Sequence, residues 1–373
     1  MAQAIMGHYD SDLSINLNAI TCNWLYIDSL SSGKTTTAAV VKANGYGLGA
    51  NEVAGALAKS GCNEFFVANL GEAISLRQHF DSRGFTEPNI MTLHGCQHEQ
   101  LVDHKAFRIT PVLNDLDQIS RWRAFSQQQI EPLPALLHFD TGMNRLGLDP
   151  EQTKWLLQNK SALDGLSCRF IMSHLACGEI INSPENANQL AAFTELQLSF
   201  SGIPASLANS AGSILPSEYH FQMTRPGIAL YGAHPAEHPT NILEPTVKWQ
   251  ARIIQVRQAK TGNRVGYGGT HQLCRDSVIA TIGVGYADGY NRGLGGKARV
   301  LVGNETAPVI GRVSMDSITV DVTDIDPMHL RHGTVELLHQ SYDLPHMAAD
   351  AKTISYEILT KLGPRLNRHY QNG

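Results

Sequence analysis

Long apolar runs, paired cysteines and surplus positive charge are all missing from this 373-residue sequence, and each absence excludes a class of protein. No stretch reaches the roughly 18 consecutive apolar residues of a membrane-spanning helix, so we expect no membrane span. None of the six cysteines forms a C-x-x-C pair, and their spacing indicates neither a zinc site nor a disulfide framework. We therefore expect reduced thiols and no bound metal.

The charge balance excludes further partners. The formal net charge is −5, which provides no electrostatic reason to expect nucleic acid or an anionic membrane as a partner. The first residues, MAQAIMGHYDSD, show no basic region followed by an apolar run, so we expect no signal peptide. Together these features predict a cytoplasmic protein.

What is present suffices for two domains. Hydrophobic residues make up 42% of the chain and charged residues 17%, so a sizeable core is expected. A (β/α)₈ barrel takes about 250 residues. The remaining chain is long enough for a second domain of ordinary size.

The first two-thirds of the chain alternate segments typical of strands with segments typical of helices. Strand patterns occupy residues 38–41, 64–68, 134–139 and 168–172. Helix patterns occupy residues 51–59, 71–79, 150–159 and 186–200. Asn51 is the expected N-cap of the first helix. The alternation predicts a parallel α/β sheet, and both an open sheet and a closed barrel fit it.

The pattern changes after about Pro235. From Thr246 onward short β-rich segments are separated by turn residues, and residues 353–361 are typical of a short helix. We place the boundary between residues 240 and 241. This predicts a barrel domain over 1–240 and a mainly-β domain over 241–373.

Polar residues gather at the predicted strand ends, where parallel α/β folds place their chemistry. Lys42 follows an apolar strand, and partial desolvation there lowers a lysine pKa and favours Schiff-base chemistry. On position alone, a lysine whose stem is buried and whose head reaches solvent is the commoner explanation. Gly45, Gly47 and Gly49 permit positive φ or form an ordinary loop.

The other strand ends are individually ambiguous. Ser210 is expected to open a helix whose N–H groups hold a phosphate, and Gly227 and Ile228 offer backbone N–H groups in the same way. Residues 224–227 precede an apolar run, 228–231, that we predict as another strand. For three further side chains, taken alone, a structural or surface role is the commoner explanation: His174, Arg145 and Arg225.

A family resemblance decides between these interpretations. AVVKANGYGLG resembles the cofactor-lysine motif of alanine racemases, the fold-type III enzymes that use pyridoxal 5′-phosphate. Nine further segments resemble that family in the same order: HFDTGMNRLGL, SHLAC, LANSAG, RPGIALYG, VGYGGT, IGVGYADGY, GRVSMD, TISYEIL and GPRLNRHY. The resemblance runs from about Leu13 to Tyr370. It implies a (β/α)₈ TIM barrel followed by a C-terminal mainly-β domain, and a head-to-tail homodimer.

The resemblance assigns catalytic roles to two residues and cofactor-binding roles to two more. Lys42 forms the Schiff base with pyridoxal phosphate and, once displaced by the amino acid, acts as a base on one face of its α-carbon. Tyr267 of the partner subunit serves the other face, which explains interconversion of L-alanine and D-alanine. Arg225 faces the pyridine nitrogen of the cofactor. His174 couples Tyr267 to Arg225 through hydrogen bonds.

The resemblance also assigns binding roles. Arg145 contacts the substrate carboxylate, and Met315 of the partner subunit donates its backbone N–H to the same carboxylate. Tyr286 lines the entrance, and Arg292 orients Tyr267. The phosphate cradle comprises Tyr46, Ser210, Gly227, Ile228 and Tyr356.

One residue departs from the family pattern. Many members have a lysine seven residues before the matched arginine, often carrying a carbamate that positions it. Here that residue is His138. We hypothesise that a bound anion or a nearby carboxylate positions Arg145 instead.

Other functions remain open. A broad-specificity racemase that also accepts serine is one, since the width of the pocket is not legible from the motifs. A pyridoxal phosphate carrier consisting of the barrel alone does not explain the β-rich segments or Tyr267. A decarboxylase of this fold does not explain the VGYGG and SMD motifs, and an aldolase with an unrelated Schiff-base lysine predicts no absorbance near the aldimine band in purified protein. Whether the enzyme supplies D-alanine for peptidoglycan or catabolises it is left undecided.

Overall fold

The computed structural model describes residues 8–235, 242–331, 333–339 and 341–371. The chain divides into two compact units. We call Ala19–Gly45 with Gly49–Glu244 the barrel unit. We call the residues up to Asn18, Tyr46–Leu48 and the residues from Pro245 onward the β unit. The predicted boundary between residues 240 and 241 lies outside the described residues.

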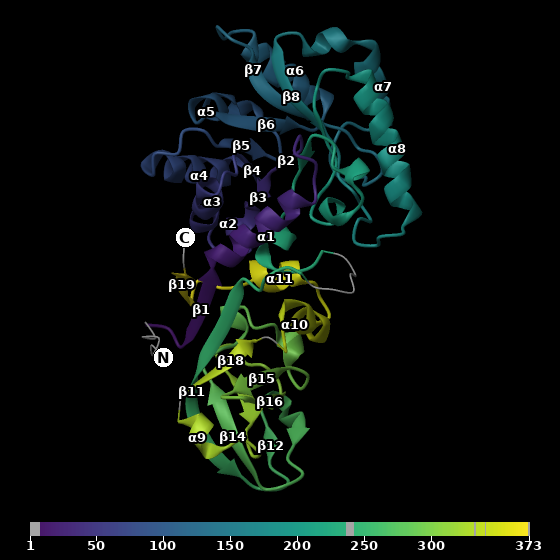
Figure 1. The fold of residues 1–373 in the computed structure, drawn as a ribbon. Coiled ribbons are helices and arrows are strands. Elements are labelled where there is room, and N and C mark those ends of the chain that lie inside the picture. Colours follow the sequence, from purple (N-terminus) through teal and green to yellow (C-terminus); the bar gives the residue numbers. More distant parts are fainter. Residues whose placement is uncertain (1–7, 236–241, 332, 340, 372–373) are drawn as a thin grey trace. The chain divides into compact units, whose positions relative to one another are not determined.

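Seven parallel strands follow one another in the sheet of the barrel unit (Figure 1). In sheet order they are β3 (Ala39–Val40), β4 (Glu64–Val67), β5 (Asn89–Thr92), β6 (Ile109–Leu113), β7 (Leu133–His138), β8 (Leu166–Met172) and β9 (Ala205–Ser206). Their register is parallel throughout, as expected when helices connect consecutive strands.

Backbone hydrogen bonds close this sheet into a barrel. β10 (Met223–Thr224) pairs in parallel with β2 (Thr36–Thr37), which runs directly into β3. On its other side, the N–H of Arg225 donates to the carbonyl of Ala208, just after β9, at 2.9 Å. The closed (β/α)₈ barrel is therefore confirmed over the open sheet.

The helices of the barrel lie outside its strands (Figure 1). They are α3 (Ala50–Lys59), α4 (Leu70–Ser82), α5 (Leu101–Ala106), α6 (Leu116–Ser126), α7 (Pro150–Gln158) and α8 (Pro184–Ser199), preceded in the chain by α1 (Leu17–Ser29). Asn69, Asp115 and Asp149 cap α4, α6 and α7 by accepting a backbone N–H. The predicted cap Asn51 is wrong: α3 begins at Ala50, whose N–H donates to the side chain of Asn44 at 3.1 Å.

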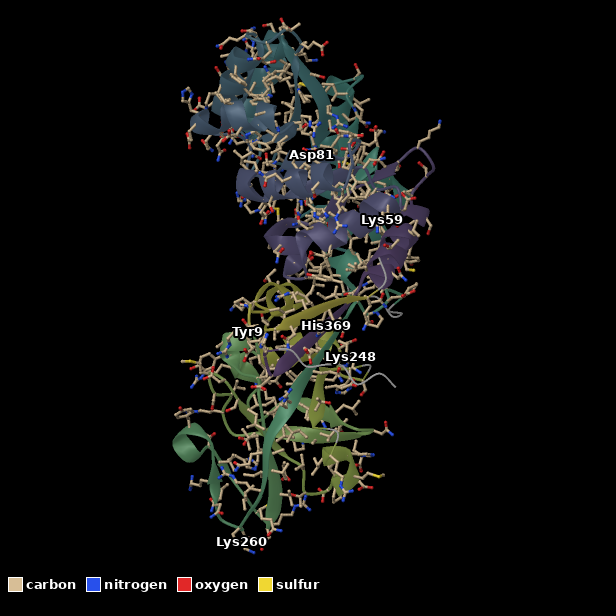
Figure 2. All side chains as sticks on the ribbon, turned by 90° about the vertical axis from the view of Figure 1, so that its left-hand side faces the viewer. Tyr9, Lys59, Asp81, Lys248, Lys260 and His369 are labelled. Atoms are coloured by element: carbon tan, nitrogen blue, oxygen red, sulfur yellow. The ribbon has the colours of Figure 1, made fainter. Side chains whose placement is uncertain are left out.

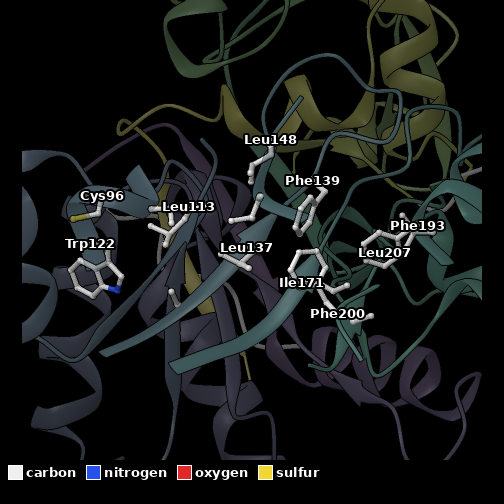
Figure 3. Close-up of a cluster of buried hydrophobic side chains, with 14 of the residues drawn as sticks. Cys96, Leu113, Trp122, Leu137, Phe139, Leu148, Ile171, Phe193, Phe200 and Leu207 are labelled. Carbon is white, nitrogen blue, oxygen red and sulfur yellow. The ribbon is translucent and has the colours of Figure 1, made fainter. Parts of the chain in front are cut away.

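Side chains fill both the space inside the strands of the barrel and the space between its strands and helices. Glu64 of β4 and Arg169 of β8 form an ion pair at 2.8 Å, although these strands are not neighbours in the sheet. That pair therefore spans the inside of the barrel. Between strands and helices, the side chains of Leu137, Phe139 and Ile171 are fully buried in one hydrophobic cluster (Figure 3).

The β unit is built around one long strand, β11 (Val247–Ala259). Its first part pairs with β1 (Ser11–Asn16) and β18 (Thr334–Leu338), and its second part pairs with β14 (Ser277–Ile282), with a shift of register between Ile253 and Gln255. Lys248 of β11 and His369 of β19 (Asn367–Gln371) lie opposite the same residue of β1, Ser14, on either side (Figure 2). The shift of register between Ile253 and Gln255 bends β11, and this lets its two parts pair with different neighbouring strands.

The main sheet of the β unit is mostly antiparallel, although β1 and β19 pair in parallel within it, and β12 (Arg264–Val265) and β13 (His271–Gln272) form a separate two-stranded sheet. The remaining strands are β15 (Arg299–Val302), β16 (Glu305–Ile310) and β17 (Ile318–Asp321). The helices are α9 (Pro327–Leu330), α10 (Leu344–Ala351) and α11 (Ser355–Thr360). The predicted mainly-β character is confirmed. No helix among the described residues is both long and apolar enough to span a membrane.

Candidate active site

The sequence-predicted residues of the barrel unit follow the carboxyl ends of its strands. Lys42 comes after β3, His174 after β8, Ser210 after β9 and Arg225 after β10, while His138 is the last residue of β7. Because these strands are parallel, all five residues belong to the same mouth of the barrel. This is the end at which barrel enzymes carry their active sites.

One predicted strand is wrong, and its correction clarifies the site. Residues 228–231 form a short 3₁₀ helix instead. The strand is β10, which comes before Arg225. Arg225 therefore follows a strand, as the other site residues do, and the 3₁₀ helix begins just beyond it.

The chain turns left-handed immediately after Lys42. Ala43, Asn44, Gly45 and Tyr46 have φ values of 52°, 55°, 61° and 54°. This conformation costs a residue with a side chain about 1–2 kcal/mol. Sequence reasoning expected positive φ only for the glycines, and it missed that three residues with side chains share it. Such strain is characteristic of functional sites.

Two side chains that sequence reasoning did not single out hold this turn. Glu72 of α4 accepts the N–H of Ala43 on one carboxylate oxygen and that of Ala68 on the other, both at 2.8 Å. Asn44 accepts the N–H of Ala50. The available signal was an acidic residue three positions after the N-cap of α4, which looks like ordinary helix capping.

The barrel mouth is rich in cationic groups. Burial lowers the pKa of Lys42, and nearby Arg145 lowers it further, whereas Glu72 opposes both. Burial, followed by Arg225 and Arg145, holds the pKa of His174 well below its usual range. Burial likewise lowers the pKa of His138 to about 3. Both histidines are therefore neutral at neutral pH.

Neighbouring amides fix the proton on each histidine. Asn209 accepts the Gly212 N–H on its side-chain oxygen, so its Nδ2 donates to His174 Nε2, at 3.2 Å. His174 thus carries its proton on Nδ1. At His138 the proton also lies on Nδ1, which donates to the side-chain oxygen of Asn114 at 2.7 Å. Each ring is held in one tautomer and one orientation.

Arg225 is a buried cation held by neutral acceptors. Its side chain is 3% exposed and donates to the Ser206 hydroxyl and, at 2.6 Å, to the Ser173 carbonyl. Among the described residues no carboxylate pairs with it, and burial lowers its pKa. The predicted coupling to His174 is not made by a direct hydrogen bond within the described part of the chain.

Backbone N–H groups converge on Ser210. Its buried hydroxyl oxygen accepts the Gly227 N–H at 2.7 Å and lies 3.4 Å from the Ala229 nitrogen. Ile228, between them, opens the 3₁₀ helix, whose first N–H groups have no partner within the helix. The predicted helix after Ser210 is a single 3₁₀ turn, residues Gly212–Ile214. Oxygen atoms of an anion suit these donors.

Arg145 lies exposed in the loop that follows β7. Asp140 shapes this loop by accepting the backbone N–H groups of Gly142, Met143 and Asn144 on one oxygen. Within the described ranges Arg145 itself makes no hydrogen bond or ion pair. The carboxylate version of our hypothesis therefore finds no support among the described residues.

The β unit carries the other predicted residues, and most are exposed. The exposed fractions are 71% for Tyr267, 54% for Met315 and 44% for Tyr286. Tyr46, which belongs to the same unit, is buried, and its ring centroid lies 6.0 Å from that of Tyr356. Arg292 makes no hydrogen bond to Tyr267 among the residues that the structure describes.

Two loops of the β unit are tied together beside Tyr286 and Met315. The N–H of Tyr286 donates to the Ser314 carbonyl at 3.1 Å, and the N–H of Ala287 to the Met315 carbonyl at 3.0 Å. A side chain at Gly285 would approach the Met315 carbonyl oxygen to 2.2 Å, so glycine is required there.

An arginine from the last predicted motif completes this connection. Arg365 contacts Asp288 in one loop and Asp316 in the other, each at 2.8 Å. Asp288 is buried and also accepts the Gly285 N–H. Arg365 is a further residue that sequence reasoning left without a role.

Comparisons with known proteins agree with this arrangement. The model of the alanine racemase N-terminal domain matches residues 15–235, and that of the C-terminal domain matches residues 246–370. The alanine racemase of Brucella suis is 43% identical over 96% of this chain and 93% of its own length. The alanine racemase of Rhodospirillum rubrum is 40% identical over 98% of each chain.

Solved structures extend the likeness to the fold. The Bartonella henselae alanine racemase, crystallised with covalently bound pyridoxal phosphate, has a TM-score of 0.91 and 37% identity, over 97% of this chain and 99% of its own. The biosynthetic alanine racemase of Pseudomonas aeruginosa has a TM-score of 0.88 and 32% identity, over 98% and 100%. With both domain models matched in order along the chain, this protein belongs to the alanine racemase family.

Proposed function

We propose that this protein interconverts L-alanine and D-alanine with pyridoxal 5′-phosphate as cofactor. The observation that carries the proposal is Lys42, a lysine of lowered pKa at the mouth of a closed barrel. It is accompanied there by Arg145, His174 and Arg225 from three other strand ends. Membership of the alanine racemase family assigns a reaction to that arrangement.

The residues of the barrel mouth fit the cofactor. Lys42, Arg145 and Arg225 bring three cationic groups together, and none forms an ion pair with a carboxylate among the described residues. Such a site favours negatively charged ligands. The phosphate of the cofactor and the carboxylate of the substrate are both of this kind. We infer that Lys42 links the cofactor covalently. The phosphate would be held by Tyr46, Ser210, Gly227, Ile228 and Tyr356.

Each side chain has a distinct task. When bound, pyridoxal phosphate stabilises the negative charge that develops at the α-carbon of an amino acid. Lys42 accepts or returns the α-proton on one face, because its lowered pKa makes the neutral amine more accessible than that of an ordinary lysine. Arg225 offers only N–H donors and disfavours protonation of a ring nitrogen placed against it. This arrangement favours return of the proton to the α-carbon.

The second face requires another base, and we infer that it is Tyr267 of the partner subunit in a homodimer. The exposure of Tyr267 and Met315 supports this inference, because exposed residues are suited to completing a neighbouring site. Arg145 and the partner's Met315 would hold the substrate carboxylate. We also propose a cytoplasmic location, which the six free cysteines support.

Proton exchange tests the reaction directly. L-Alanine incubated with the enzyme in D₂O should yield D-alanine that carries deuterium at the α-carbon, without pyruvate or ethylamine. Chiral chromatography with mass spectrometry measures both products. Absence of exchange in cofactor-loaded enzyme would refute the proposal, and faster exchange with serine would redirect it to a broader racemase.

A further inference from the structure

The turn that carries Lys42 holds a left-handed conformation with few hydrogen bonds of its own. The N–H of Gly45 donates to the Val41 carbonyl at 2.8 Å, and the N–H of Gly49 donates to the Asn44 carbonyl at 2.8 Å. Residues with side chains stay left-handed only where the surrounding structure holds them. The contacts that hold Ala43, directly beside Lys42, must therefore come from another element.

Glu72 provides those contacts from the first turn of α4. Its Oε1 accepts the N–H of Ala43, and its Oε2 accepts the N–H of Ala68, which directly follows β4. β3 and β4 are neighbouring strands, so one carboxylate connects the ends of both. Glu72 is itself fixed, since its own N–H donates to the side chain of the N-cap Asn69 at 3.1 Å.

We propose that Glu72 is a positioning residue of the active site, whose carboxylate holds the left-handed turn at Ala43 and thereby fixes Lys42 at the barrel mouth. The inference rests on the proposed function, because it takes Lys42 to be the residue that binds pyridoxal phosphate. Both carboxylate oxygens are needed, since each accepts from a different strand end. A glutamine at this position has one acceptor and would set its NH₂ group against a backbone donor.

The negative charge of Glu72 adds an effect that separates positioning from folding. Glu72 raises the pKa of Lys42, whereas burial and Arg145 lower it. Removing the charge lowers the Lys42 pKa further, so the amine becomes neutral and reactive at a lower pH. A defect that only loosened the fold would not move that pH in this direction.

The experiment compares Glu72→Gln with Glu52→Gln, an exposed glutamate in the first turn of α3. Each purified full-length enzyme is titrated with pyridoxal phosphate across a pH series and then reduced with borohydride. Mass spectrometry measures the fraction of protein that carries the covalent cofactor. We expect Glu72→Gln to weaken covalent cofactor binding on the order of 10- to 100-fold, the range of charge-assisted hydrogen bonds. Its pH midpoint should fall, and Glu52→Gln should match wild type in both respects.

A rescue variant keeps the inference testable even if Glu72→Gln is poorly folded. Ala43→Gly removes the penalty of positive φ at the residue that Glu72 holds. Combined with Glu72→Gln, it should restore cofactor binding several-fold, while Ala43→Gly alone should bind nearly as wild type does. Failure of this rescue, with a melting temperature equal to that of wild type, would overturn the inference.

The outcomes also separate the inference from the proposed function. Wild-type enzyme that binds the cofactor at Lys42 but does not racemise alanine would refute the proposed function and leave the role of Glu72 standing. Wild-type enzyme that racemises alanine, together with a Glu72→Gln variant of unchanged affinity and pH midpoint, would refute the role of Glu72 alone.

Discussion

The barrel unit and the β unit contribute to the proposed site in opposite ways. In the barrel unit His138 and Arg225 are buried and His174 is half-buried, and each is fixed by hydrogen bonds to neutral groups. In the β unit Tyr267 and Met315 stand exposed. Burying a polar group costs free energy unless it is hydrogen-bonded, and these side chains are hydrogen-bonded, so the barrel half of the proposed site is already fixed in place. In the proposed homodimer, the exposed residues of the β unit would complete the site of the partner subunit.

The loops behind the exposed residues support this interpretation. Although Met315 is exposed, its loop is tied to the loop of Tyr286 by backbone bonds and through Arg365. Exposure in the β unit therefore does not mean a loose backbone. A rigid loop that presents exposed side chains is what a shared site between two copies requires.

The strongest test of the comparison separates the two halves onto different chains. Lys42→Ala and Tyr267→Phe should each reduce turnover by about 10²–10⁴-fold or more, since each removes a base. Mixed and reassembled, the two inactive proteins should recover about a quarter of wild-type activity. Half of the dimers are then mixed, and each mixed dimer has one intact site of two.

The racemase assay before and after refolding the mixture measures this recovery. Mixing either variant with itself is the control, and it should recover nothing. No recovery in a mixture shown to contain mixed dimers would mean that Lys42 and Tyr267 act within one chain.

A second prediction concerns the ion pair inside the barrel and its contribution to the stability of the barrel unit. Arg169→Met removes the partner of Glu64 in the barrel interior and leaves a buried carboxylate unpaired. We expect a loss of about 2–3 kcal/mol in the free energy of unfolding, less than for a fully buried pair, because Arg169 is partly exposed and Asn89 still donates to Glu64. Chemical denaturation measures it, and the exposed pair Lys260–Asp276 of the β unit provides the control. An unchanged stability would mean that water replaces the arginine.

The sequence predicted the elements of the barrel unit better than it predicted the closure of the barrel sheet. The strand–helix alternation predicted the strands β3, β4, β7 and β8 and the helices α3, α4, α7 and α8 to within a few residues, because periodicity reports which faces are buried. It did not predict β5, β6, α5 or α6. Closure of the sheet was not legible from that pattern, because it depends on β10 and β2, which have two residues each. Strands this short leave no periodic signal.

The site was predicted by motif more than by pattern. Lys42 alone was ambiguous, since position after a strand fits several roles. The role of Glu72 was not predicted, because an acidic residue at the start of a helix is ordinarily explained by capping. Its contact with Ala43 also spans 29 residues of sequence. Arg365 escaped for the same physical reason: a long-range contact to two loops leaves no local trace in the sequence.

Because of the histidines at the barrel mouth, we predict that mild acid lowers the stability of the barrel unit. His138 and His174 are neutral in the folded protein because burial lowers their pKa values, whereas in the unfolded chain the histidine pKa is about 6.5. The unfolded state therefore binds more protons below that pH. Stability is complete above about pH 6.5 and falls toward pH 3, by about 2 kcal/mol for one such histidine at pH 5.

Denaturation at a series of pH values tests this sensitivity. His138→Gln, which keeps a polar side chain beside Asn114, should flatten the dependence between pH 7 and pH 5. The exposed His346 of the β unit, changed to asparagine, is the matched control and should leave the slope unchanged. Equal slopes in wild type and His138→Gln would assign the acid sensitivity elsewhere.

The smallest expected effect concerns the loop that carries Met315. Asp316→Asn weakens one of the two contacts of Arg365 without touching buried Asp288, so the fold should be retained. If the loop backbone holds the substrate carboxylate, the KM for alanine should rise about two- to fivefold with little change in kcat, in proportion to an exposed ion pair. Asp324→Asn, which breaks the comparable Arg275–Asp324 pair, should change neither. A fall in kcat without a change in KM would place Arg365 with the proton transfer of Tyr267 instead, and the β half would then be more than a rigid carrier of exposed groups.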